Sequence, residues 1–353
     1  MFPKIKDLYR FNKHYPPEKE IGIEIEMEGS RLMIRPNATW SVHRDGSLRG
    51  QEAIEYIIKG PTELSNVNKV LTKLVDLMNT PDREYRTGPA KLEPSDRCGV
   101  HVHINVQDMI FTEVFNFMFL YLMLEHVLVG YCGESREGNM FCLRGSDAEY
   151  LINSMMQTKE TSDLGRLGGP VGGLIRYSSM NPAALFKFGS VEFRALKTPE
   201  NLMEIEEWVK ILHRVKEASL KYDDPVQVVE QYSMEGEGQF FDNIMGDMAP
   251  ILRKKVDNIE DRLLEGMRVA QDIAYTPTLY MPQPLSSKKK KKTSDMWLEP
   301  PAPRGLRGAD FVIVDEGVNV QPGHLNWARG AVGVAAAPEA AVAEEAPRRR
   351  RPR

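Results

Sequence analysis

Residues 21–28 read Ile-Gly-Ile-Glu-Ile-Glu-Met-Glu, so apolar residues alternate with glycine or glutamate along the whole stretch. A period of two predicts a β-strand with one apolar face and one acidic face. Glu24 and Glu26 then project side by side, and like charges that close repel unless a cation or strong hydrogen-bond donors lie between them. Taken alone, this strand fits an acidic face in water as well as it fits a metal site.

Three later segments repeat the design of a strand with one apolar and one ionisable face. They are residues 52–58 with Glu55, residues 98–106 with His101 and His103, and residues 189–196 with Glu192 and Arg194. The economical arrangement is an α+β fold built on one curved, mostly antiparallel sheet, with helices packed on its apolar convex face. The polar faces of the four strands would then converge in a concave trough.

Helical spacing of apolar residues predicts a helix over residues 64–78 and further helices between residues 198 and 274. The most apolar segment, residues 110–131, includes Glu113, Asn116, Glu125 and His126, which favours a buried helix over a membrane span. We also expect a second strand over residues 30–39 and a turn over residues 42–47.

Composition changes sharply after residue 280. Residues 1–280 are expected to form one catalytic domain, with motifs in 20–200 and helices in 200–280. Residues 281–353, which include Lys288–Lys292 and Arg348–Arg351, are expected to be a low-complexity, largely disordered tail. Residues 285–353 hold 13 Lys and Arg against 8 Asp and Glu, so a net charge of −4 divides into +5 for this part and −9 for the rest. An acidic body binds nucleic acid poorly, and only the tail offers a contact for nucleic acid or an acidic surface.

The overall composition is that of an ordinary globular protein. Apolar residues make up 42% of the chain and charged residues 27%. The three cysteines have no metal or redox spacing, and the N-terminus lacks the features of a signal peptide. These features lead us to expect a cytoplasmic protein.

Each polar motif has an ordinary structural explanation when it is considered alone. Two exposed histidines on a strand account for His101 and His103, and a surface ion pair accounts for Glu192 and Arg194. The conjunction of all of them is much less expected by accident. Carboxylates with imidazole suit Mg²⁺ or Mn²⁺, and Mn²⁺ tolerates nitrogen better. Arg194 would supply a fixed positive fork for a phosphate.

The motifs, in this order, resemble those of the amidoligase family. The resemblance rests on residues 22–26, residues 45–48 with the glutamate strand after them, residues 98–103, Asn181, and residues 191–194. That family belongs to the carboxylate–amine ligases and is similar in fold to glutamine synthetase and glutamate–cysteine ligase. The resemblance covers about residues 20–200. Because such proteins are common in bacteriophages and bacteria, it implies a bacterial cytoplasm, that of the host if the protein is phage-encoded.

The resemblance implies ATP-dependent formation of an amide or peptide bond from small-molecule or peptide carboxylate and amine substrates. It implies Mg²⁺ or Mn²⁺ held by metal ligands at Glu24, Glu26, Glu55, His101, His103 and Glu192. The choice between His101 and His103 stays open, and Glu52 competes with Glu55. The catalytic residues would be Arg194, Arg176 and Glu192, and the ATP-binding residues would be Arg194, Arg176 and Asn181. The glycine-rich residues 165–173 are the candidate cover that excludes water.

Two other functions remain open. A metal-dependent hydrolase also uses His-x-His on a strand, but it needs further ligands downstream. After His103 only His126, His213 and His324 remain, and they lie in predicted helices or in the tail. The second alternative is a non-catalytic, ligase-like protein that binds a partner or forms part of a virion.

Overall fold

The computed structural model describes residues 2–32, 35–81, 88–168 and 175–278. Its strands are β1 (Ile21–Ser30), β2 (Trp40–Arg44), β3 (Glu52–Ile58), β4 (Lys91–Glu93), β5 (Val100–Asn105), β6 (Met180–Asn181) and β7 (Ser190–Phe193). Its α-helices are α1 (Ile5–Leu8), α2 (Val67–Asn79), α3 (Phe111–Tyr131), α4 (Glu149–Thr161), α6 (Ala184–Phe188), α7 (Glu204–Ser219), α8 (Pro225–Met245), α9 (Ala249–Lys255) and α10 (Ile259–Ala274). The fold is therefore α+β, as predicted.

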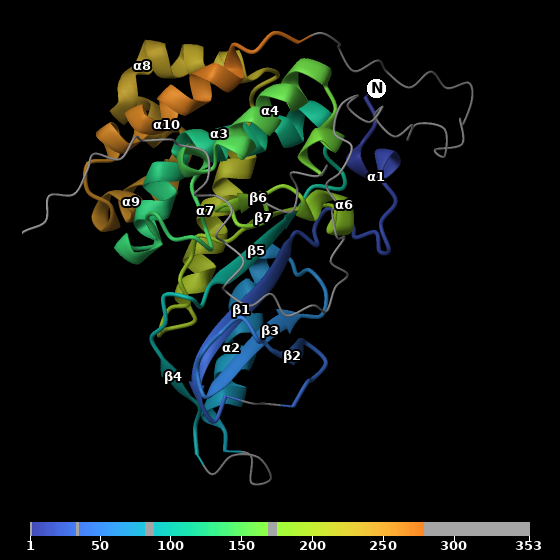
Figure 1. Ribbon diagram of the computed structural model, residues 1–353, viewed down its shortest axis with the longest axis vertical. Helices are drawn as coiled ribbons and strands as arrows, with labels where there is room; N and C mark the ends of the chain where they lie inside the picture. Colours follow the sequence, from blue (N-terminus) through green and yellow to red (C-terminus); the bar gives the residue numbers. More distant parts are fainter. Residues whose placement is uncertain (1, 33–34, 82–87, 169–174, 279–353) are drawn as a thin grey trace, which may run out of the picture. The chain divides into compact units, whose positions relative to one another are not determined.

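The strands form one seven-stranded sheet (Figure 1). Six strands follow the order β2-β3-β1-β5-β7-β6, and the seventh, β4, pairs with the C-terminal end of β1. Every pairing between these strands is antiparallel. The sheet is open and uncurled, so the expected curvature into a trough is wrong. Cross-strand register, rather than curvature, brings the polar side chains together.

The apolar face of the sheet packs against the hydrophobic core. On β1 the side chains of Ile21, Ile23 and Ile25 are fully buried. Helix α2 covers the β2 side, where the Trp40 indole donates a hydrogen bond to the carbonyl of Val70. Because side chains alternate along a strand, burying this face leaves Gly22, Glu24 and Glu26 on the opposite one.

Helix α3 is the central helix of the core. It is long and apolar enough to cross a membrane, yet 89% of its apolar window is buried inside the structure, which is the environment of a core helix. Helix α10 lies along it (Figure 1). The approach is close enough that a Cβ atom at Gly266 would come within 2.0 Å of the Met123 carbonyl oxygen, so only glycine fits there.

Two local expectations are wrong. Among the described residues of 30–39, only Ser30 lies in a strand, as the end of β1; β2 begins at Trp40 and extends into the first residues, 42–44, of the expected turn. The reason is tertiary: Trp40 is fully buried beneath α2 and Val42 packs against the core, and this burial outweighs the local turn signal. The predicted tail, residues 281–353, lies outside the described residues.

Candidate metal centre

Strand register sets the polar face. Glu24 on β1 lies opposite His101 on β5, and Glu26 on β1 lies opposite Glu55 on β3. Residues directly opposite each other in an antiparallel pair have their side chains on the same face. The acidic positions of β1 are therefore flanked on one side by imidazole and on the other by a further carboxylate.

The same register continues across β5, β7 and β6. His103 lies opposite Glu192, and Glu192 lies opposite Asn181. On β1 the partner of His103 is Gly22, where an added Cβ atom would approach the Cβ of His103 to 3.1 Å. Glycine at this position gives the imidazole its space between the strands.

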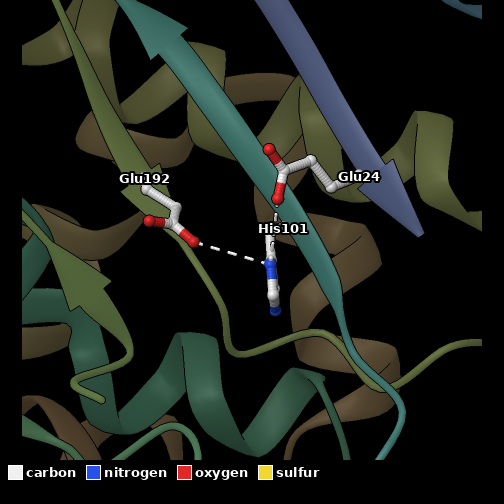
Figure 2. Close-up of side chains that lie close together, drawn as sticks. All are labelled: Glu24, His101 and Glu192. Atoms are coloured by element: carbon white, nitrogen blue, oxygen red, sulfur yellow. Dashed lines mark hydrogen bonds and ion pairs between the residues drawn. The ribbon is translucent and has the colours of Figure 1, made fainter. Parts of the chain in front are cut away.

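Glu24, His101 and Glu192 form the first group of potential metal ligands (Figure 2). The Nδ1 atom of His101 lies 3.4 Å from Oε2 of Glu24 and 3.5 Å from Oε1 of Glu192. His101 and Glu192 are buried, whereas the Glu24 side chain keeps 23% of its surface exposed. The group is thus enclosed on two sides and open at Glu24.

Glu26, Glu55 and His101 form the second group. The other ring nitrogen of His101, Nε2, lies 3.6 Å from Oε1 of Glu26. The second oxygen of Glu26 accepts a hydrogen bond from the backbone N–H of Gly99 at 2.9 Å, which fixes the carboxylate. His101 therefore stands between two carboxylate pairs, with one ring nitrogen toward each.

The two histidines have different surroundings. His101 belongs to both groups, whereas His103 directs Nδ1 to the hydroxyl of Ser190 at 3.0 Å. The Nε2 atom of His103 is buried, has no hydrogen-bond partner, and lies 3.5 Å from Oε1 of Glu24. His103 is thus placed to support Glu24 rather than to complete either group.

Glu52 and Glu55 lie on opposite faces of β3. Glu52 shares the face of the buried residues Ile54 and Tyr56 and accepts a hydrogen bond from the backbone N–H of Leu32. Glu55 lies three residues after Glu52, so its side chain is on the opposite, polar face of the strand, where it belongs to the second group. The strand geometry therefore favours Glu55 over its competitor.

Arg194 and Asn181 both contact Glu192. The Arg194 guanidinium donates to Oε1 of Glu192 at 2.6 Å, and the Asn181 amide donates to Oε2 at 2.6 Å. These two bonds orient the carboxylate and leave the buried Nε of Arg194 without a hydrogen-bond partner. Arg194 thus retains an unused hydrogen-bond donor beside the potential metal ligands.

Arg176 is not joined to the other predicted site residues by any hydrogen bond or ion pair within the described ranges. Its side chain is exposed, and its guanidinium carbon lies 4.8 Å from the centre of the Tyr177 ring. Of the glycine-rich candidate cover, residues 169–173 lie outside the described residues. The roles of Arg176 and of this segment stay predictions.

Burial and neighbouring charges shift the acidities of these groups in opposite directions. Burial would raise the pKa of Glu24, but its interactions with the imidazoles of His101 and His103 outweigh burial and hold that pKa well below its usual value. Glu192 is similar: burial opposes ionisation, and the charges of His103 and Arg194 lower its pKa overall. Burial followed by the charge of Glu24 raises the pKa of Glu55 to about 7. The cluster thus contains carboxylates that ionise readily and one that does so reluctantly.

A cavity of about 210 Å³ adjoins the cluster at its Gly22 end. Glu24 and His103 are among its polar lining residues, and Ile57, Pro61 and Phe188 are among its apolar ones. Phe188 stands edge-on to the His103 ring, with ring centres 5.5 Å apart. The cavity therefore leads from an apolar surface directly to the potential metal ligands.

Three residues near the cluster were missed by sequence reasoning. Ser190 and Glu20 extend the period-two faces of Glu192 and Gly22, so stricter use of alternation would have found them. Glu20 lines the cavity and is held by Lys216 at 2.7 Å and His213 at 2.9 Å. Arg136 follows α3 in a polar loop, and no sequence signal marks it.

Comparison of the chain with protein-family models gives no match, and comparison with curated protein sequences gives no significant match.

Proposed function

We propose that this protein is an ATP-dependent carboxylate–amine ligase with a glutamine-synthetase-like catalytic domain. One observation carries the proposal: two groups of potential metal ligands share His101 on the polar face of an antiparallel sheet. The motif order that resembles the amidoligases supplies the reaction class. An exposed acidic strand face would not need buried imidazole and arginine around it.

The donor set fits Mg²⁺ or Mn²⁺. Carboxylate oxygens dominate, the two groups share the imidazole of His101, and the buried Nε2 of His103 beside Glu24 has no hydrogen-bond partner. A neutral imidazole has one lone pair and one N–H, so His101 can bind one cation and donate a hydrogen bond to the carboxylate on its other side. Glu24, Glu192 and His101 would hold one cation and Glu26 with Glu55 a second. Bound cations would neutralise the phosphate charges of ATP.

The reaction joins two groups that do not combine spontaneously. An oxygen of the substrate carboxylate attacks the γ-phosphorus of ATP, the bond from that phosphorus to the ADP oxygen breaks, and an acyl phosphate forms. The amine then attacks the acyl carbon, phosphate leaves with the bonding electrons, and the nitrogen loses a proton. Arg194, with its free Nε–H beside Glu192, is placed to donate to a phosphate oxygen during the first step.

Exclusion of water matters because water would hydrolyse the acyl phosphate. The apolar part of the cavity, formed by Ile57, Pro61 and Phe188, offers a dry surface beside the polar face. A ligand placed there would cover Glu24 and His103, which line the cavity.

The first experiment is a calorimetric titration with Mn²⁺, followed by an assay of ADP release from ATP and Mg²⁺ with pairs of candidate acids and amines. ADP formation that requires both an acid and an amine supports the ligase. Metal-dependent cleavage of a substrate without ATP would instead indicate the hydrolase, and cation binding without turnover of any kind would indicate a binding protein. The double variant Glu24→Gln with Glu192→Gln is the control, and unchanged ADP release in it would remove the site assignment.

A further inference from the structure

Arg136 is the most deeply buried arginine beside the cluster, with 1% of its surface exposed. It ends a short 3₁₀ turn, Glu134–Arg136, that follows α3 through Gly133, whose φ of 104° favours glycine. Its guanidinium donates to the backbone carbonyls of Ala195 at 2.8 Å and Arg194 at 2.8 Å. Arg136 therefore holds the backbone at Arg194 and Ala195, the two residues that follow the end of β7.

The third hydrogen bond of Arg136 reaches the other strand of the site. Its Nη1 donates to the carbonyl of Asp96 at 3.2 Å, just ahead of β5. The neighbouring backbone pair is closed by a hydrogen bond from Val100 to Leu196 at 2.8 Å. Arg136 thus fastens the entry of β5 to the exit of β7, the strands that carry His101 and Glu192.

Among the described residues, Arg136 forms no ion pair with a carboxylate, although carboxylates lie close by. The position that a Cβ atom would take at Gly99 lies 3.4 Å from Nη2 of Arg136, 3.5 Å from Oε2 of Glu26 and 3.5 Å from Nε2 of His101. A permanent positive charge therefore stands beside the Glu26, Glu55 and His101 group without neutralising any of its members directly. The hydrogen bonds of its guanidinium go to backbone carbonyls, and the exposed carboxylate of Asp96 adds an electrostatic interaction.

We infer that Arg136 is a positioning residue that tunes the charge of the cluster, an inference that rests on the proposed function. Its fixed charge repels a bare divalent cation and attracts the anion that accompanies one. Arginine stays charged in proteins, so this bias does not vary with pH. The site is thereby poised for a cation that carries phosphate rather than for a free cation.

The test separates this role from a structural one because the two predict different signs. In Arg136→Gln, Mn²⁺ alone should bind about tenfold more tightly, while inorganic triphosphate at saturating Mn²⁺ should bind about tenfold more weakly. A purely structural role predicts that both affinities fall together with the melting temperature, and that result would overturn the inference. Both affinities are measured by calorimetry on the full chain.

Two further variants complete the design. Arg262→Gln removes an arginine that also donates to backbone carbonyls, those of His126 and Asp257, but lies outside the cluster, so both affinities should stay unchanged. Arg136→Lys keeps the charge and loses the planar fork, so its melting temperature should fall while its Mn²⁺ affinity changes by less than about twofold. If Arg136→Gln does not fold, the lysine variant decides, and a parallel loss of stability and Mn²⁺ affinity would refute the inference. Absence of Mn²⁺ binding by the unaltered protein would overturn the proposed function itself and the inference with it.

Discussion

Glu24 on β1 and His101 on β5 lie directly opposite each other, with Oε2 of the carboxylate 3.4 Å from Nδ1 of the imidazole. Packing on the opposite face of the sheet fixes this pairing, because Ile23, Ile25 and Val102 on the same two strands are fully buried in the core. A slip of one residue would turn these apolar side chains out of the core and turn the two site residues into it. Core packing therefore fixes the geometry of the polar face.

The two histidines should differ in their effect on cation binding. Because His101 belongs to both ligand groups, His101→Asn should weaken Mn²⁺ binding by more than about 100-fold, whereas His103→Asn, which removes a supporting contact, should weaken it by about tenfold. Calorimetric titration of both variants checks this. Equal losses in the two variants would show that His103 is also a ligand.

Glu55 and Glu52 provide a matched pair on one strand. Glu55→Gln should lower Mn²⁺ affinity with little loss of stability, because it removes a carboxylate that is costly to ionise. Glu52→Gln should leave the affinity unchanged and cost about 1 kcal/mol of unfolding free energy, since it weakens the acceptor for the Leu32 N–H. Calorimetry and urea unfolding measure the two quantities, and the reverse pattern would place the site on the other face of β3.

Cation binding should depend on pH through Glu55. Because the pKa of Glu55 is raised to about 7, this carboxyl is largely protonated below neutrality, and a cation must displace its proton. Mn²⁺ affinity should therefore rise with pH up to about 7 and level off above it. The Glu55→Gln variant should lose this dependence between pH 6 and 8, and a slope that persists in it would assign the proton to another group.

Glu125 on α3 should make the unfolding free energy fall as pH rises. Its carboxylate accepts hydrogen bonds from Ser179 and from the backbone of Gly145, but burial dominates and raises its pKa to about 7. A carboxyl whose pKa is raised on folding stabilises the protein fully below its unfolded pKa of 4.5, and that contribution is lost as pH rises through 7.

The expected loss from Glu125 is about 3 kcal/mol, since each unit of pKa corresponds to about 1.4 kcal/mol. Urea unfolding at several pH values, compared between the unaltered protein and Glu125→Gln, isolates this contribution. The difference in unfolding free energy should grow in favour of the variant between about pH 4.5 and 7 and level off at higher pH. A constant difference would show that Glu125 ionises normally.

Removal of residues 288–353 should leave the compact unit of residues 1–287 intact. The core and both ligand groups are contained in the described part of residues 1–287, which forms one compact unit. The shortened chain should melt within about 2 °C of the full chain and retain its Mn²⁺ affinity. Loss of cation binding on truncation would place part of the site in the removed segment.

The sequence alone determined the elements that carry the site. Alternation marked β1, β5 and β7, and β-branched and aromatic residues marked β3. Because side chains alternate along a strand, each of these strands was expected to carry its ionisable residue, Glu24, His101, Glu192 or Glu55, on the face opposite the core. Helical periodicity likewise marked α2 and α7, and a long apolar run marked α3.

Only the tertiary structure decided how these strands meet. Periodicity carries no register, so the pairing of Glu24 with His101, the double role of His101 and the exclusion of Glu52 required the assembled sheet. The position of Arg136 also follows only from the tertiary structure, because this residue is held beside the cluster by hydrogen bonds to the backbone carbonyls of Asp96, Arg194 and Ala195. Contacts between a side chain and a distant backbone leave no pattern in the residue order, because any residue type offers the same carbonyl group.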